Sequence, residues 1–194
     1  MLARSTMALG AALFSSPPGL AQLPSTEPGK WRPVVYADLQ LPGETALPYA
    51  SLWADELRRN NDAYKAKGDK RFLVANAPAA ESHVVIRSPD RVVVLSVLHT
   101  VTACTVLRRD VSHATLKSCP MRLAIYENGQ SRVADAGKGC FIEYAASQGG
   151  TAPDMVRNAA LAAYDIESRT IRAGIVFQGQ AADECQFRVP IPRS

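Results

Sequence analysis

The sequence predicts an α+β fold dominated by β structure: an antiparallel sheet, sandwich or barrel of about seven or eight strands. One helix near the N-terminus and a set of disulfides complete this expectation. Three observations lead to it. Apolar and polar residues alternate through most of the chain after residue 80. Pro-Asp and Asn-Gly turn signals separate the alternating segments. Helical spacing of apolar residues is convincing over one stretch only.

The N-terminus has the organisation of a secretory signal peptide. Residues 1–21 contain a single charge, Arg4, followed by an apolar run from Met7 to Phe14, a Ser-Pro-Gly breaker and small residues ending at Ala21. A bilayer-spanning helix needs about 20 apolar residues, so this run is too short to be one. We therefore expect cleavage after Ala21, export to the periplasm or the medium, and one globular β-rich domain over residues 22–194 without a transmembrane segment.

The charge of the chain argues against nucleic acid as a partner. Lys and Arg number 22 and Asp and Glu 18, and cleavage would remove Arg4, leaving a net charge of +3. This excess is too small to indicate a nucleic-acid-binding protein. Basic residues are concentrated only in residues 57–71, which read as a solvated helix end or as a contact for an anionic polymer or acidic partner.

One strand and the helix are predicted in the first third of the chain. Residues 33–41 read as a strand that closes at a Pro-Gly pair. Residues 47–67 then show apolar residues at near-helical spacing, including Trp53 and Leu57, with Gly68 as a stop signal.

The next segment predicts a hairpin around Pro89-Asp90, since proline suits the first central position of a turn. Folding there sets Val85 opposite Val94 and Ile86 opposite Val93. The second strand is apolar on both faces, which predicts a central position in the sheet.

A second hairpin is predicted at Asn128-Gly129, a pair that favours the type I′ turn because both residues need positive φ. Its register sets Arg122 opposite Asp135 and Ala124 opposite Val133. Cys119 then lies two residues short of Cys140 on the same side of the ribbon, and the glycines at 137 and 139 allow a bulge.

The four cysteines, Cys104, Cys119, Cys140 and Cys185, predict two disulfides, each contributing about 3 kcal/mol in an exported chain. Their spacing lacks the close pairs of a zinc site, and no cofactor is expected. Three connectivities are open. The hairpin favours Cys119–Cys140 with Cys104–Cys185, and the competing set is Cys104–Cys119 with Cys140–Cys185.

The C-terminal third predicts two further strands. Thr151 and Asp154 resemble a capping box, which predicts a short helix near Ala152. The stretch that follows to Ile166 reads as helix or strand. Residues 170–178 and 184–192 alternate clearly. Two prolines in the latter segment predict an edge strand, because proline cannot donate a ladder hydrogen bond.

Catalytic motifs are absent from the sequence. There is no G-x-S-x-G, P-loop, dinucleotide or H-E-x-x-H pattern. His83 and His99 read as structural histidines in strands, and His113 as an exposed linker residue. His99 with Cys104 would be the one base and nucleophile pair, but five residues along a strand place them on opposite faces. The carboxylates of Asp183 and Glu184 are adjacent along an expected strand and so should face apart. We therefore expect no enzyme.

Two loops are the candidate partner-binding segments, because loops carry function more often than the scaffold that holds them. One is the tip of the second hairpin and the other a glycine-rich loop. The predicted functional classes are a protein-binding module such as an inhibitor or immunity protein acting on a cell-wall enzyme, an envelope or secretion component or polysaccharide binder, and a small hydrolase. The candidate residues are Tyr126, Glu127, Asn128, Gly129 and Gln130 in the tip, and Ser147, Gln148, Gly149, Gly150 and Thr151 in the loop.

Overall fold

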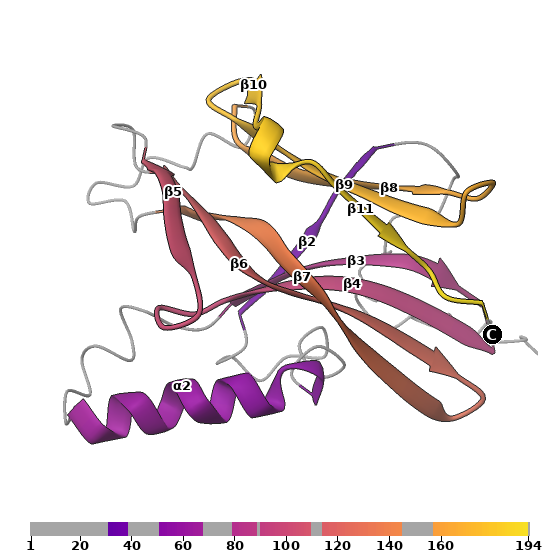
Figure 1. Ribbon diagram of the computed structural model, residues 1–194, viewed down its shortest axis with the longest axis horizontal. Coiled ribbons are helices and arrows are strands. Elements are labelled where there is room, and N and C mark those ends of the chain that lie inside the picture. Colours follow the sequence, from indigo (N-terminus) through magenta and orange to yellow (C-terminus); the bar gives the residue numbers. More distant parts are fainter. Residues whose placement is uncertain are drawn as a thin grey trace, which may run out of the picture.

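The computed structural model describes residues 31–38, 51–67, 79–88, 90–109, 114–144 and 157–193. These form two antiparallel sheets and an α-helix, α2 (Figure 1). The elements are β1 (Arg32–Pro33), β2 (Val35–Asp38), α2 (Ala54–Lys67), β3 (Ala79–Arg87), β4 (Arg91–His99), β5 (Thr105–Arg109), β6 (Ala114–Glu127), β7 (Gln130–Tyr144), β8 (Ala159–Asp165), β9 (Thr170–Phe177), β10 (Gln180–Ala181), the 3-10 helix η1 (Asp183–Cys185) and β11 (Phe187–Pro190). The predicted signal peptide and the helix expected near Ala152 lie outside the described residues.

The two sheets have different strand orders. The six-stranded sheet runs β2-β3-β4-β6-β5, with β7 also paired to β6, and the five-stranded sheet runs β1-β8-β9-β10, with β11 also paired to β9. The sheets are not closed into a barrel, so that predicted alternative is wrong. The mainly β content, the antiparallel pairing, the helix and the two disulfides are confirmed.

The first predicted strand is divided between the two sheets. β1 pairs with β8 in the five-stranded sheet, whereas β2 pairs with β3 in the six-stranded sheet. The chain crosses between them at Val34, whose N–H still bonds to the Ala160 carbonyl at 3.0 Å. Sequence alternation cannot reveal such a crossing, because both strands have the same period.

The core has two layers, one on each face of the six-stranded sheet. One layer lies between the sheets, and the other lies beneath α2, on the far side of the six-stranded sheet (Figure 1). β4 contributes to both layers and lies between β3 and β6, as its two apolar faces predicted. The first layer contains Val93, Leu95, Met121, Leu123, Ile125, Ala162, Ile171, Val189 and Ile191, and the second contains Leu52, Trp53, Val94, Leu98 and Ala124.

α2 is held to the sheet by its first turn and by the two residues that precede it. The indole Nε1 of Trp53 donates a buried hydrogen bond of 2.9 Å to Ser96 Oγ on β4. Arg122 on β6 lies over the same indole, 4.4 Å from its centroid, and donates hydrogen bonds of 2.8 and 2.9 Å to the Asp55 carboxylate and of 2.6 Å to the Leu52 carbonyl. These contacts place the helix across β4 and β6.

The β3–β4 hairpin contains a bulge. Ile86 lies opposite Val93, as predicted, but Val94 lies opposite Val84 instead of Val85. The register shifts at this point because Val85 is an extra residue on β3.

The β6–β7 hairpin follows its predicted register near the turn. Arg122 lies opposite Asp135 and Ala124 opposite Val133, and the turn residues Asn128 and Gly129 have φ of 50° and 73°. These two positive φ values are what the Asn-Gly pair predicted.

A one-residue bulge near Gly137 makes the favoured disulfide prediction wrong. Gly137 has a φ of 86° and its N–H donates to Asp135 Oδ1 at 2.7 Å. Beyond it, Cys119 lies opposite Gly139, so Cys140 lies opposite Ser118. Because successive side chains of a strand alternate between its faces, a shift of one residue turns Cys140 away from Cys119.

The disulfides are Cys104–Cys119 and Cys140–Cys185, the competing pairing. Cys119 packs with Phe141 and Cys104, whereas Cys140 lies in a separate cluster with Cys185. The first bridge connects the segment before β5 to β6 within one sheet. The second connects β7 to η1 and so joins the two sheets covalently.

The C-terminal strands show which of the two predicted alternatives, helix or strand, the stretch before Ile166 adopts. The stretch before Ile166 is the strand β8 and not a helix. The predicted strand over 184–192 is shorter than expected: its first part is η1, and β11 begins at Phe187. β11 pairs only with β9 among the described strands, which agrees with the predicted edge position.

Candidate functional site

The turns of two hairpins lie together at one end of the six-stranded sheet (Figure 1). Arg91 on β4 is directly opposite Glu127 on β6, and the Asn128 N–H donates to the Asp90 carbonyl at 3.3 Å. We call this end the hairpin-tip surface, comprising Asp90, Arg91 and residues 126–132. It is a pre-ordered structure, because both turns are fixed by backbone hydrogen bonds.

Charged side chains of both signs alternate on the hairpin-tip surface. Glu127 lies between two arginines: its Oε1 is 3.7 Å from Arg91 Nε and its Oε2 3.3 Å from Arg132. Arg132 is the more exposed of the two, with 58% of its side chain accessible against 17% for Arg91. Arg132 therefore pairs with Glu127 and is also accessible from solvent. Its exposure allows it to contact a second molecule.

Tyr126 anchors the base of the hairpin-tip surface. Burial raises the pKa of its hydroxyl above the usual 10.0, and a hydrogen bond with Ser51 acts in the opposite direction. Tyr126 thus contributes rigidity to the site while Asn128, Gly129 and Gln130 are exposed.

An open hollow of about 400 Å³ lies on the hairpin-tip surface. Both polar and apolar groups of the two turns form its walls. The residues lining it are Asp90, Arg91, Val92, Tyr126, Glu127, Asn128, Gly129, Gln130 and Ser131. An open hollow of this kind suits a side chain or loop of another protein better than an enclosed small molecule.

The structure places the first set of candidate binding residues together and does not describe the second set. Tyr126, Glu127, Asn128, Gly129 and Gln130 all line the hollow. The glycine-rich loop residues, Ser147, Gln148, Gly149, Gly150 and Thr151, lie outside the described part of the chain. Sequence reasoning missed Asp90, Arg91 and Arg132, although the Pro-Asp turn was itself a signal that a second hairpin ended nearby.

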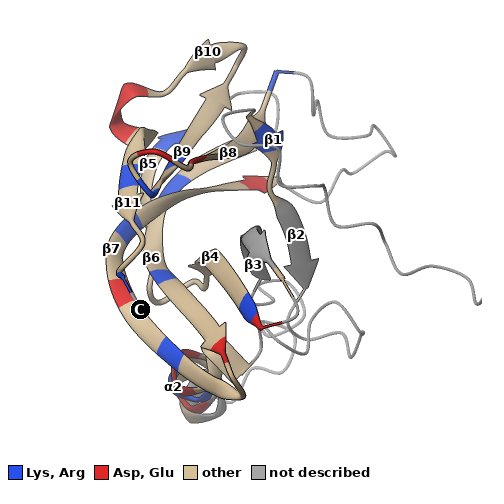
Figure 2. Ribbon diagram, turned by 90° about the vertical axis from the view of Figure 1, so that its right-hand side faces the viewer, with Lys and Arg blue, Asp and Glu red and all other residues tan. Residues whose placement is uncertain are grey.

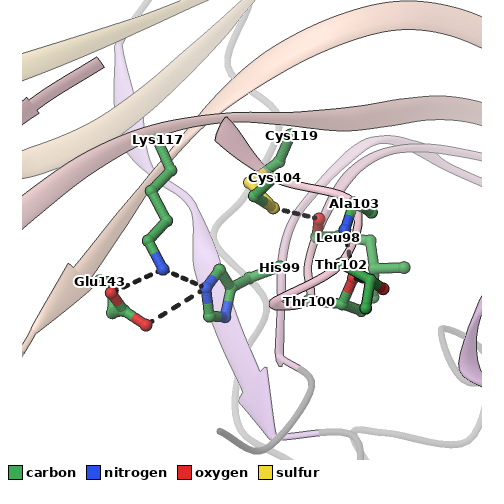
Figure 3. The surroundings of a disulfide bond; sticks show 9 residues. All are labelled: Leu98, His99, Thr100, Thr102, Ala103, Cys104, Lys117, Cys119 and Glu143. Atoms are coloured by element: carbon green, nitrogen blue, oxygen red, sulfur yellow. Dashed lines mark hydrogen bonds and ion pairs between the residues drawn. A yellow bond between two sulfur atoms is a disulfide. The ribbon is translucent and has the colours of Figure 1, made fainter. Parts of the chain in front are cut away.

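A second polar cluster surrounds His99, at the end of β4 (Figure 3). His99 is 4% exposed and stacks on Phe141, with ring centroids 4.8 Å apart. Its Nε2 is 2.9 Å from Lys117 Nζ and 3.3 Å from Glu143 Oε1, and Lys117 Nζ is 2.7 Å from Glu143 Oε2. Lys117 Nζ and Glu143 Oε1 therefore both approach the same ring nitrogen of His99, and Lys117 also contacts the second oxygen of Glu143.

The His99 cluster holds Glu143 ionised. A hydrogen bond from His99 is the largest cause of its lowered pKa, which falls from 4.5 to about 2, with further lowering by Lys117 and an opposing effect of burial. This arrangement matches the structural histidine expected at His99.

Cys104 has no thiol available to the His99 cluster. Its sulfur is bonded to Cys119 beside the cluster, as Figure 3 shows. The base and nucleophile pair that the sequence raised is therefore excluded for these two residues. The side chain of His83, in β3, and the whole of His113 lie outside what the structure describes.

The two carboxylates at 183–184 lie in η1 and not in a strand. Glu184 forms a bidentate ion pair with Arg108 of β5, at 2.6 and 2.7 Å, and this pair lowers the Glu184 pKa. Glu184 thus joins η1 to the edge of the six-stranded sheet and is engaged in structure.

Within the described residues, the structure shows no ligand-sized cavity between the sheets, no candidate metal site and no candidate membrane-spanning helix. The cavity between the sheets has a volume of about 30 Å³, which is close to that of one water molecule and far below a typical ligand pocket of about 300 Å³. No group of three or more His, Cys, Asp or Glu side chains in this part of the chain is placed to hold a metal ion. None of the helices described there is both long enough and apolar enough to cross a bilayer.

Comparison of the chain with protein-family models, curated protein sequences and solved structures found no match.

Proposed function

We propose that the protein is an exported protein-binding module of sandwich-like fold whose hairpin-tip surface inserts into the cleft of a partner. An inhibitor or immunity protein acting on a cell-wall enzyme is the form of this function that we favour. The observation that carries the proposal is the pair of hydrogen-bonded turns around an open hollow, with Arg132 exposed and Glu127 beside it. A pre-ordered loop loses little conformational entropy on binding, which favours tight association.

The disulfides support the expected location. Two disulfides and no free cysteine among the described residues are compatible with a periplasmic or extracellular protein, because such bonds persist in oxidising compartments. The proposed signal peptide over residues 1–21 supports the same location.

Affinity capture from an envelope extract of the source organism tests the proposal. The bait is the mature chain from Gln22, compared with Arg132→Glu in the hairpin-tip surface and with Arg109→Glu as the control. Arg109 is exposed on β5 and carries the same charge, so its reversal matches the change in net charge away from the site.

We expect the wild-type bait and the Arg109→Glu bait to retain one soluble envelope enzyme in stoichiometric amount, and the Arg132→Glu bait to lose it. Capture of membrane or secretion proteins instead would support an assembly component. Equal retention by all three baits would show that the hairpin-tip surface is not the binding site.

A further inference from the structure

The outward face of the five-stranded sheet carries a transverse row of Trp31, Ala163, Arg172 and Arg188. Ala163 lies opposite Arg172, and Arg172 opposite Arg188, in the strand register. Trp31 precedes Arg32, the partner of Ala162, and is therefore level with Ala163. Because side chains alternate along a strand and the neighbours Ala162, Ile171 and Val189 are in the core, this row faces away from it.

Trp31 and Arg172 form the first half of the row. The guanidinium carbon of Arg172 is 5.5 Å from the centroid of the Trp31 ring, and Ala163 between them is 1% exposed. The small side chain at 163 allows the longer residues on either side to approach each other above it. Trp31 nevertheless remains 44% exposed, which leaves a flat apolar surface beside a cation.

Arg172 and Arg188 place two positive charges directly across neighbouring strands, an arrangement that destabilises a sheet. Within the described residues, Arg188 makes no hydrogen bond or ion pair, and the buried Nε of Arg172 has no hydrogen-bond partner. Asp165 lies on the same face, but its Oδ1 accepts the N–H groups of Glu167 and Ser168 in the β8–β9 turn. Hydrogen bonding with Ser168 is the largest cause of the lowered pKa of Asp165, and Arg172 is near enough to contribute to it, but neither arginine of the row forms an ion pair with a carboxylate of the described residues.

A basic segment of β9 is visible in this part of the molecule in Figure 2. A guanidinium group presents a planar fork of donors that matches a carboxylate, and an indole beside it offers a flat apolar face. A sheet surface is also open and level, so an extended polymer can lie along it.

We propose that the row of Trp31, Arg172 and Arg188 binds an acidic polysaccharide, with a sugar ring on the indole and its carboxylate on the two arginines. Single-stranded nucleic acid is the less favoured occupant. Proteins that bind it use a series of stacking aromatic residues along a basic groove, whereas this row contains one aromatic residue, Trp31. The site is distinct from the hairpin-tip surface, so either proposal can fail without the other.

Binding of polygalacturonate to the mature protein tests this proposal. Trp31 is exposed and Trp53 is fully buried, so a titration followed by tryptophan fluorescence reports mainly on Trp31. Fully methyl-esterified polygalacturonate keeps the sugar chain but removes its charge, and an oligothymidylate tests the alternative class of polymer. The variants are Arg188→Gln, Trp31→Phe and Trp31→Ala, and the matched control is Arg109→Gln on the other sheet. Because the two Trp31 variants lack the fluorescent reporter, their affinities are measured by equilibrium dialysis.

We expect the wild type and Arg109→Gln to bind the polyuronate equally, and the esterified polymer to bind at least ten-fold more weakly. Loss of a charge-assisted contact in Arg188→Gln should weaken binding by roughly ten-fold. Trp31→Ala should weaken it similarly, and Trp31→Phe less. The proposal is overturned if the wild type does not bind, if Arg188→Gln behaves as Arg109→Gln does, if esterification has no effect, or if the oligothymidylate binds more tightly.

Discussion

Removing the Cys140–Cys185 disulfide should destabilise the protein more than removing Cys104–Cys119. The two bridges close chain segments of different length, with sequence separations of 45 and 15 residues. In the chain-entropy description, a bridge restricts the unfolded state more when its loop is longer. That relation gives about 4 kcal/mol for the longer loop and about 3 kcal/mol for the shorter one.

The structure adds a second reason for this order. Cys140 is in β7 of one sheet, and Cys185 ends η1 beside β11 of the other. This bridge therefore holds the two sheets together, whereas Cys104–Cys119 does not. Cys185 is fully buried, in a cluster with Leu116 and Phe177. Separation of the sheets would therefore expose part of the core.

Urea unfolding of two double variants, Cys140→Ala/Cys185→Ala and Cys104→Ala/Cys119→Ala, measures the difference. Alanine avoids a buried hydroxyl, and non-reducing peptide mapping confirms that the remaining bridge is formed. The wild type in oxidising buffer is the reference for both. A larger loss of unfolding free energy in the Cys104/Cys119 variant, or a mapped Cys119–Cys140 peptide in the wild type, would refute the reasoning.

Three other changes probe the packing around the strands. Glu143→Gln should lower the unfolding free energy at pH 7 by about 1–2 kcal/mol, a value reduced for the 34% exposure of the Glu143 side chain. The pKa of Glu143 is lowered from 4.5 to about 2 in the folded protein, so its contribution to stability is complete above pH 4.5 and is lost as the pH falls towards 2. The difference in unfolding free energy between the wild type and Glu143→Gln, measured with denaturant, should therefore be smaller at pH 3 than at pH 7. Arg122→Met should cost about 1–2 kcal/mol, since it removes the hydrogen bonds to Asp55 and Leu52, and a thermal melt followed by Trp53 fluorescence checks this; an unchanged melt would contradict the role given to Arg122. Gly137→Ala should lower the unfolding free energy by about 1 kcal/mol, because alanine disfavours the φ of 86° at this position. An added Cβ would meet no atom within 4 Å, so steric overlap adds nothing to this cost. A chemical-denaturation midpoint equal to that of the wild type would show that the bulge does not require glycine.

Local patterns were sufficient to predict the turns and most strands. Asn128-Gly129 requires positive φ at both positions whatever surrounds it, so the β6–β7 turn and the register next to it follow from two residues. The central position of β4 follows from its apolar residues on both faces. At the hairpin-tip surface, the residues contributed by this turn were predicted, but Asp90 and Arg91 come from a turn that is distant in the sequence.

The sequence by itself determined the period, polarity and turn chemistry of the elements, because these depend on neighbouring residues along the chain. Only the tertiary structure decided the disulfide pairing, the crossing at Val34 and the row of Trp31, Arg172 and Arg188. Each of these depends on which strands become neighbours, or on a single inserted residue such as the one at the Gly137 bulge. A shift of one residue reverses the face of every side chain beyond it, and alternation alone contains no information on where that shift occurs.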